Sequence, residues 1–170
     1  MAMIDSGSGW IAGWAVGKTA KAKLALRCWE AAKENLAKVG QHPPQGLIVH
    51  HDQDTVYTSY RWLRQLLMVD KAVVSYCERG AKDTPWMESF WGHFKVKNSS
   101  FLEAATLEEL EWVIGNQVKY AGHERRHSRL DYRSSMHYLI STGFIPERLA
   151  EKRAKSGFAP EPLGGGHGAA

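Results

Sequence analysis

The stretch LIVHHDQDTVYTSYRWLRQLL, from Leu47 to Leu67, combines a short apolar run, a polar loop and a helical pattern. The run Leu47–His51 is typical of a strand that is buried on both faces of a parallel sheet. Thr58 or Ser59 is the expected N-cap of the helix that follows. One face of this helix carries its apolar side chains, namely Trp62, Leu63, Leu66 and Leu67. A strand followed closely by a helix predicts an α/β fold.

The expected strand ends in a cluster of side chains that commonly bind metals: His50, His51, Asp52 and Asp54. Ligand sites in open α/β sheets lie at the carboxyl ends of the strands, so Asp52 has the position of a site residue. An ordinary strand end followed by a polar loop has the same composition. The pattern alone leaves both interpretations open.

The segments before this stretch extend the α/β pattern. Met1–Ile4 and Trp10–Val16 are expected to pair as a hairpin around a turn rich in Gly and Ser. Thr19–Val39 is rich in Ala and Leu and predicts a helix. Thr19 is its expected N-cap, and Gly40 is expected to follow its last turn.

The segments after the stretch continue the alternation of strands and helices. Lys71–Tyr76 predicts a second short buried strand, and Pro85 favours the start of a helix. Thr106 and Glu109 have the spacing of a capping box. They precede a helix whose apolar stripe comprises Leu107, Leu110, Val113, Ile114 and Val118.

The composition excludes several classes of protein. A chain of 170 residues suits one domain with a real core, and a net charge of +4 is a mild indication of an anionic partner. Cys28 and Cys77 are too few for a disulfide scaffold or a structural zinc site, which favours a reducing, cytosolic setting. The sequence contains no apolar run near the ~18 residues of a membrane span, so we expect no membrane partner.

The helix expected after Pro85 carries a polar stripe with a chemical pattern. Glu88, Gly92 and Lys95 follow each other at i, i+4 and i+7, beside an apolar stripe of Met87, Phe90, Trp91 and Phe94. This combination suits a nucleic-acid backbone. The carboxylate of Glu88 would hold a metal, Gly92 would permit close approach, and Lys95 would neutralise a phosphate. The alternative is a solvated helix face, which is common.

Several motifs resemble, in the right order, those of the retroviral-integrase-like DDE transposases of bacterial insertion sequences. The family's His-Ser-Asp-x-Gly-x-x-Tyr-x-Ser pattern is matched by His50, Asp52, Tyr57 and Ser59. Its Asp-Asn-x-x-x-Glu-Ser-Phe pattern with a later Lys is matched by Asp83, Glu88, Ser89, Phe90 and Lys95. The 35 residues 53–87 that separate the two acids give the family's gap. MIDSGSGWIAGWAV and YAGHERRHSRLDY resemble its second and third strands and a later element, so the resemblance covers roughly residues 1–140.

The resemblance implies a ribonuclease H-like fold, a mixed sheet flanked by helices, in a catalytic core over residues 1–145. Residues 146–170 would form a basic and then Gly-rich disordered tail. Asp52 and Glu88 would bind Mg²⁺ or Mn²⁺, which prefer oxygen ligands. Two such ions activate the nucleophile and hold the leaving oxygen in an in-line displacement at phosphorus.

The sequence also departs from the family. The family's first catalytic Asp lies on a central first strand, which would precede Met1. We therefore expect a truncated chain that is marginally stable alone, or that fills the gap by dimerising or rearranging. His51 replaces a family Ser, and Asp54 replaces a family Gly at a position where φ is positive in a tight turn. Asp54 as a substitute carboxylate is a further alternative.

HERRH, from His123 to His127, matches the zinc-protease pattern H-E-x-x-H, with Glu124 as general base. The basic run around it and the absence of a nearby third ligand favour a chance match. The basic run suits phosphate contacts instead. The expected DNA contacts are Lys95, Arg125, Arg126, His127 and Arg129.

These observations favour a DDE-type transposase core that cleaves and transfers DNA strands with a bound metal. A catalytically inactive remnant that binds DNA or the full-length transposase is the alternative, and a zinc protease is a third hypothesis. The expected partners are DNA and either a second copy of the chain or full-length transposase. The expected location is the bacterial cytoplasm, at the nucleoid.

Overall fold

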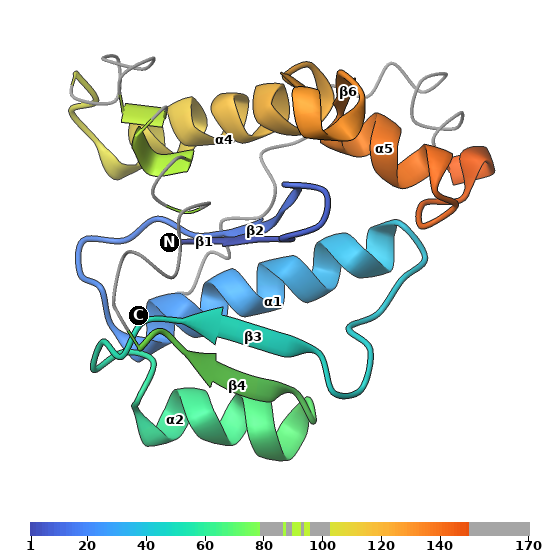
Figure 1. The fold of residues 1–170 in the computed structure, drawn as a ribbon. Coiled ribbons are helices and arrows are strands. Elements are labelled where there is room, and N and C mark those ends of the chain that lie inside the picture. The colour runs from blue at the N-terminus through green and yellow to red at the C-terminus, as the bar shows by residue number, and fades with distance from the viewer. Residues whose placement is uncertain (79–86, 88–89, 93, 96–102, 150–170) are drawn as a thin grey trace.

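The computed structural model describes residues 1–78, 87, 90–92, 94–95 and 103–149. Its strands form three separate two-stranded sheets (Figure 1). The strands β1 (Ala2–Ile4) and β2 (Ile11–Trp14) pair antiparallel, as the hairpin prediction required. The strands β3 (Ile48–His51) and β4 (Val73–Tyr76) pair parallel, from Ile48 opposite Val73 to His51 opposite Tyr76. The α/β expectation is therefore confirmed.

The helix α1 (Ala22–Lys38) packs against both of these sheets. Its start differs from the prediction, because Lys21 rather than Thr19 occupies the N-cap and provides no side-chain cap. Gly40 does follow the helix, with φ of +75°, and its N–H donates to Ala37 O at 3.0 Å. The α1 backbone lies against β2 so closely that only a glycine fits at position 13.

One hydrophobic cluster joins the two sheets through α1. Trp29 and Ala32 of α1 are buried, and they pack with Met3 of β1, Val49 of β3 and Val74 of β4. Among the described residues, no strand pairs with both β1 and β3, so the sheet is interrupted between these two strands. A continuous mixed sheet is therefore not formed by this part of the chain.

The β3–β4 sheet is covered on one face only. The exposed fraction is 65% for Ile48 and 49% for Val73, which are partners across the two strands. The prediction that Leu47–His51 is buried on both faces is therefore wrong for the described residues. The covered face is the one that carries Val49 and His51.

The helix after this sheet's first strand is α2 (Tyr60–Leu63), which widens into the π-helix η1 (Arg64–Val69). Ser59 is its N-cap and accepts a hydrogen bond from Trp62 N. Trp62 and Leu66 are fully buried as expected, whereas Leu67 is exposed. The change from α to π geometry alters the number of residues per turn, and the α-helical face predicted for Leu67 is lost with it.

Asp70, directly after η1, ties this helix to α1. Its carboxylate accepts hydrogen bonds from Trp29 Nε1 at 2.7 Å, Gln65 Nε2 at 2.8 Å and Lys33 Nζ at 3.2 Å. Burial alone raises the pKa of a carboxyl group, but these three bonds outweigh it and lower the pKa of Asp70.

The helices α4 (Leu107–His123) and α5 (Ser135–Ser141) lie on the β1–β2 side of the molecule (Figure 1). The predicted capping box is present, with Glu109 N donating to Thr106 Oγ1 at 3.1 Å. Val118 of α4 packs with Ile11 and Trp14 of β2. None of the described helices is both long and apolar enough to cross a membrane.

A small hairpin connects these two helices. It consists of β5 (Arg126–His127), the 3₁₀ turn η4 (Ser128–Leu130) and β6 (Arg133–Ser134). The strands pair antiparallel, with Arg126 opposite Ser134. Most of the expected tail, residues 150–170, lies outside the described residues.

Candidate functional site

Asp52 is the first residue after β3 and is exposed at the carboxyl end of the parallel pair. Its Oδ1 accepts a hydrogen bond from Asp54 N at 3.1 Å, and Asp54 Oδ1 accepts one from Val56 N at 2.8 Å. Each carboxylate accepts from the backbone N–H two residues later, so two successive Asx turns fix the loop. Asp54 has no positive φ, so the strain suspected at this Gly position is absent. Its carboxylate is engaged in the turn, which does not favour it as a substitute ligand.

His51 is buried and holds the backbone of Asp52 from within the core. Its Nε2 lies 3.1 Å from Trp62 Nε1, and its Nδ1 lies 2.9 Å from Asp52 O. Because an indole only donates and a carbonyl only accepts, His51 must carry its proton on Nδ1 and be neutral. Burial lowers the pKa of His51 and favours this form.

Aromatic rings surround His51 and complete its environment. Its ring stacks on Tyr57 with centroids 4.6 Å apart and meets Tyr76 edge-on at 4.9 Å. Burial, and to a smaller extent the charge of Asp52, raises the pKa of Tyr57 to about 12. His51 is thus a structural residue under the loop, and both of its ring nitrogens are occupied.

His50 points to the opposite face of β3 and is also engaged. Its Nδ1 lies 2.9 Å from Ser75 Oγ, and its Nε2 lies 3.3 Å from Cys77 Sγ. In the described part of the chain, no three His, Cys, Asp or Glu side chains gather as a metal site. The ring nitrogens of His50 and His51 therefore make structural contacts with β4 and the residue after it, with Asp52 and with α2.

The remaining candidate at this end is the carboxylate of Asp52 itself. Its exposed oxygens are hard donors that suit Mg²⁺ or Mn²⁺, and Oδ2 has no hydrogen bond among the described residues. Its expected partner Glu88, with Asp83 and Ser89 of the same motif, lies outside the described residues. Within the described residues, Asp52 is therefore the one member of the expected ligand pair whose surroundings can be compared with the needs of a metal.

The helical residues near Glu88 agree with the two stripes read from the sequence. The rings of Phe90, Trp91 and Phe94 contact one another, and Phe94 is buried. Gly92 and Lys95 are exposed, and a Cβ added at Gly92 would meet no atom within 4 Å. Among the described residues, none covers Gly92 on this face.

The zinc-protease alternative fails on geometry. The helix α4 ends at His123, Glu124 is its C-cap, and His127 already belongs to β5. The two histidines therefore do not lie one turn apart on a single helix, which the H-E-x-x-H motif needs. The interpretation of this match as chance is confirmed.

The basic residues of the hairpin have different roles. Arg126 is exposed, whereas Arg129 donates from Nη1 to Ser6 O at 3.0 Å and so joins the hairpin to the β1–β2 turn. His127 is half-buried, and its Nε2 is buried without a hydrogen-bond partner among the described residues. Burial, with the nearby charges of Arg125 and Arg129, lowers the pKa of His127. The Nε2 atom is thus not exposed to a phosphate.

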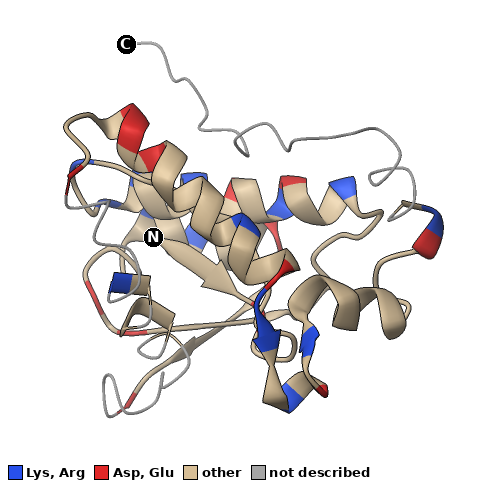
Figure 2. Cartoon of the chain, turned by 90° about the horizontal axis from the view of Figure 1, so that it is seen from above, with Lys and Arg blue, Asp and Glu red and all other residues tan. Residues whose placement is uncertain are grey.

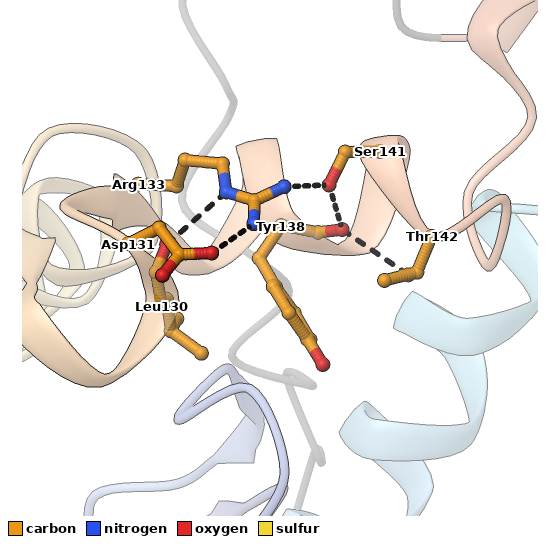
Figure 3. Close-up of polar contacts among 6 residues, drawn as sticks. All are labelled: Leu130, Asp131, Arg133, Tyr138, Ser141 and Thr142. Atoms are coloured by element: carbon orange, nitrogen blue, oxygen red, sulfur yellow. Dashed lines mark hydrogen bonds and ion pairs between the residues drawn. The ribbon is translucent and has the colours of Figure 1, made fainter.

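Arg133 is a further basic residue of the hairpin, and its guanidinium is used within the fold (Figure 3). It donates to Leu130 O at 3.1 Å, to Ser141 Oγ at 2.7 Å and to Asp131 Oδ2 at 2.7 Å. It also lies over the ring of Tyr138, 5.6 Å from the centroid. The sequence did not predict these contacts of Arg133, because only the folded turn brings Leu130, Asp131 and Ser141 to its guanidinium.

The candidate residues form two groups rather than one. The β3 strand lies on one side of α1, and the hairpin with β6 lies on the other side, beyond β1 and β2 (Figure 1). Blue Lys and Arg positions gather on the hairpin, and red Asp and Glu positions mark the start of α4 (Figure 2). Asp52 and the basic hairpin would therefore contact separate parts of an extended ligand.

Two curated proteins are similar to this chain. One is named the transposase for insertion sequence element IS904 of Lactococcus lactis subsp. lactis (strain IL1403) and is 32% identical over 132 residues, 77% of this chain. The other is named the insertion element IS600 uncharacterized 31 kDa protein of Shigella sonnei and is 33% identical over 97 residues, 56% of this chain. The chain spans 50% of the first relative and 35% of the second.

No family model matches the chain. No solved structure matches it either.

Proposed function

We propose that this chain, which is related in sequence to the transposases of bacterial insertion sequences, serves in DNA transposition as part of a DDE-type catalytic core. The observation that carries the proposal is the position of Asp52. It presents an exposed carboxylate at the carboxyl end of a parallel strand pair, on a loop fixed from below by His51 and from within by Asp54.

The chemistry would be metal-dependent cleavage and transfer of DNA strands. Asp52 and Glu88 would hold Mg²⁺ or Mn²⁺, which supply Lewis acidity at the phosphorus and its oxygens when bound. The protein's own contribution is to fix the backbone of Asp52 through the neutral His51 and its carboxylate through Asp54 N, so that the side chain stays at the strand end. Lys95 and the exposed Arg126 would contact DNA phosphates.

A second copy of the chain or full-length transposase is the proposed protein partner. β1 and β3 each pair on one side only among the described residues, and both pack on α1. A strand supplied by the partner would give hydrogen bonds to the second edge of β1 and of β3. A rearrangement of the chain into a ribonuclease H-like sheet would do the same. The proposed location is the bacterial cytoplasm, at the nucleoid.

Binding without catalysis is the alternative, and one observation favours it. The β5–β6 hairpin and β3 lie on opposite sides of α1 (Figure 1), so the hairpin can bind DNA whether or not the carboxylate of Asp52 is functional. Such a chain would act as an inactive remnant that occupies DNA or joins full-length transposase.

A strand-transfer assay separates these functions. The substrate is a supercoiled plasmid with an oligonucleotide bearing the element's end, with Mg²⁺ or Mn²⁺ and with EDTA as the blank. Asp52→Asn is the informative variant, because its amide oxygen still accepts the bond from Asp54 N and preserves the loop. Glu147→Gln, at an exposed residue outside the site, is the matched control.

The catalytic proposal expects product that needs the metal and falls at least about a hundredfold in Asp52→Asn, while Glu147→Gln is unchanged. DNA binding with no metal-dependent product supports the alternative. Product that persists in EDTA, or that is equal in Asp52→Asn, contradicts the DDE mechanism.

A further inference from the structure

The tip of the β5–β6 hairpin exposes an aromatic side chain on a strained backbone. Tyr132 is 70% exposed, and its φ is +58°, next to Asp131 with φ of +52°. A left-handed conformation costs a residue with a side chain about 1 kcal/mol or more, and Gly would avoid this cost. Because the ring is not packed in the core, burial does not compensate for the strain.

Hydrogen bonds hold this tip in place. Tyr132 N donates to His127 O at 3.0 Å, and Arg133, on the other side of Tyr132, donates back to Leu130 and Asp131 (Figure 3). Ser135 is fully buried, and its Oγ donates to Ser8 O at 2.8 Å. The hairpin is therefore anchored on the β1–β2 turn, and Tyr132 projects from a fixed platform.

The charges near the tip suit an anion. Lys119 and Arg126 are exposed, and neither forms an ion pair among the described residues. Of the acids in or next to the hairpin, Asp131 pairs with Arg133 at 2.7 Å, and Glu124 is exposed at the end of α4. Arg126 is thus an exposed cation of the same hairpin as Tyr132, and Lys119 lies in the last part of the helix that leads into it.

A second exposed aromatic residue provides the contrast. Trp112 of α4 is 66% exposed, but Glu108, Glu109 and Glu111 flank it in the first half of the helix. Figure 2 shows the acidic and basic ends of this surface. Exposure is therefore similar for Trp112 and Tyr132, and the charge around them is opposite.

We propose that the β5–β6 hairpin binds an unpaired nucleotide of single-stranded DNA, with the base stacked on Tyr132 and the flanking phosphates neutralised by Arg126 and Lys119. Bases in a duplex already stack on their neighbours, so a single projecting ring can add stacking only to a base that is free. The assignment to DNA rests on the function proposed above.

The test measures binding of fluorescein-labelled DNA by anisotropy, with the full chain in EDTA so that the metal site plays no part. The probes are a single strand of roughly 20 nucleotides and a blunt duplex of the same sequence. Tyr132→Gly is the main variant, because it removes the ring and also relieves the left-handed strain, so weaker binding does not reflect a damaged fold. Trp112→Ala is the matched control.

We expect Tyr132→Gly to weaken single-strand binding by about five- to a hundredfold, with less than a twofold effect on the duplex. Tyr132→Phe is expected to bind as the wild type does, since it keeps the ring. Arg126→Ala should weaken both probes and reduce the dependence of log Kd on log salt by about one.

Unchanged single-strand binding in Tyr132→Gly overturns the inference, as does an equal loss in Trp112→Ala or an equal loss for the duplex. The outcome is separable from that of the strand-transfer assay. Binding that depends on Tyr132 without metal-dependent product upholds the hairpin site and rejects catalysis. Product that depends on Asp52 with no role for Tyr132 does the reverse.

Discussion

The hydrogen bond between Trp62 and His51 gives the sharpest test of how the Asp52 loop is held. Trp62→Phe removes the indole N–H and leaves the Nε2 atom of a buried histidine without a donor. A buried polar atom left unpaired costs about 1–3 kcal/mol. The smaller ring adds a cavity cost on the order of 1 kcal/mol. We therefore expect Trp62→Phe to lower the free energy of unfolding by about 2–4 kcal/mol.

The partner variant His51→Phe keeps a ring for stacking on Tyr57 but leaves the indole N–H of Trp62 unpaired. It is expected to cost about 1–3 kcal/mol. The double variant removes both polar groups and should cost less than the sum of the singles by about 1–2 kcal/mol. Urea unfolding at neutral pH, followed by far-ultraviolet circular dichroism, measures all four proteins. Additivity within about 0.5 kcal/mol would refute the reasoning.

The same bond predicts a pH dependence with a definite sign. Burial places the folded-state pKa of His51 below the unfolded value of about 6.5. The stability that this difference contributes is complete above pH ~6.5 and is lost as pH falls from there toward the folded-state pKa. Urea midpoints of the wild type should therefore fall between about pH 7 and pH 5, and His51→Phe should reduce this fall. An identical pH profile in His51→Phe would show that other groups cause it.

Further variants test the core and the network around α1. Asp70 has a lowered pKa because its hydrogen bonds outweigh its burial, so its charge stabilises the fold above about pH 4 and this stability is lost on acidification. The urea midpoint of the wild type should therefore fall as the pH is lowered through this range, and Asp70→Asn should remove this fall. Gly13→Ala places a Cβ against Cys28 O and Ala32 N of α1 and should lower the free energy of unfolding by about 3 kcal/mol or more. Gly92→Ala, whose added Cβ meets no described atom within 4 Å, should melt as the wild type does by circular dichroism. Burial raises the pKa of Cys28 to about 11, so iodoacetamide at mildly alkaline pH should label it only after urea unfolding, as read by peptide mass spectrometry.

Local patterns predicted the elements of this fold well because their causes lie within a few residues. The capping box at Thr106 and Glu109 and the N-cap at Ser59 each need only a short polar side chain at a fixed spacing. Gly40 follows α1 because a left-handed residue there favours glycine. The N-cap preference of Thr19 did not decide the start of α1, because the helix begins at Ala22 after Lys21, which provides no side-chain cap.

Long-range contacts decided what the sequence left open. Both histidines after the apolar run looked equally suited to a metal, yet His51 is occupied by Trp62 and His50 by Ser75 and Cys77. The pairing across β3 and β4 places Ser75 opposite His50, and no local pattern contains that register. Arg126 and Arg133 differ for the same reason. The hairpin leaves Arg126 exposed, whereas the guanidinium of Arg133 binds Leu130 and Asp131 in the turn.

The arrangement around α1 links these local results to function. The β1–β2 turn supports the basic hairpin through Ser6 and Ser8, while Asp52 follows β3 on the other side of α1. The two sheets share no strand in the described residues, so the helix that both contact sets their relative position. A DNA ligand of the proposed kind, in contact with the hairpin and Asp52 together, would therefore depend on the packing of α1. We expect Gly13→Ala to lower the product of the strand-transfer assay even though it touches neither group.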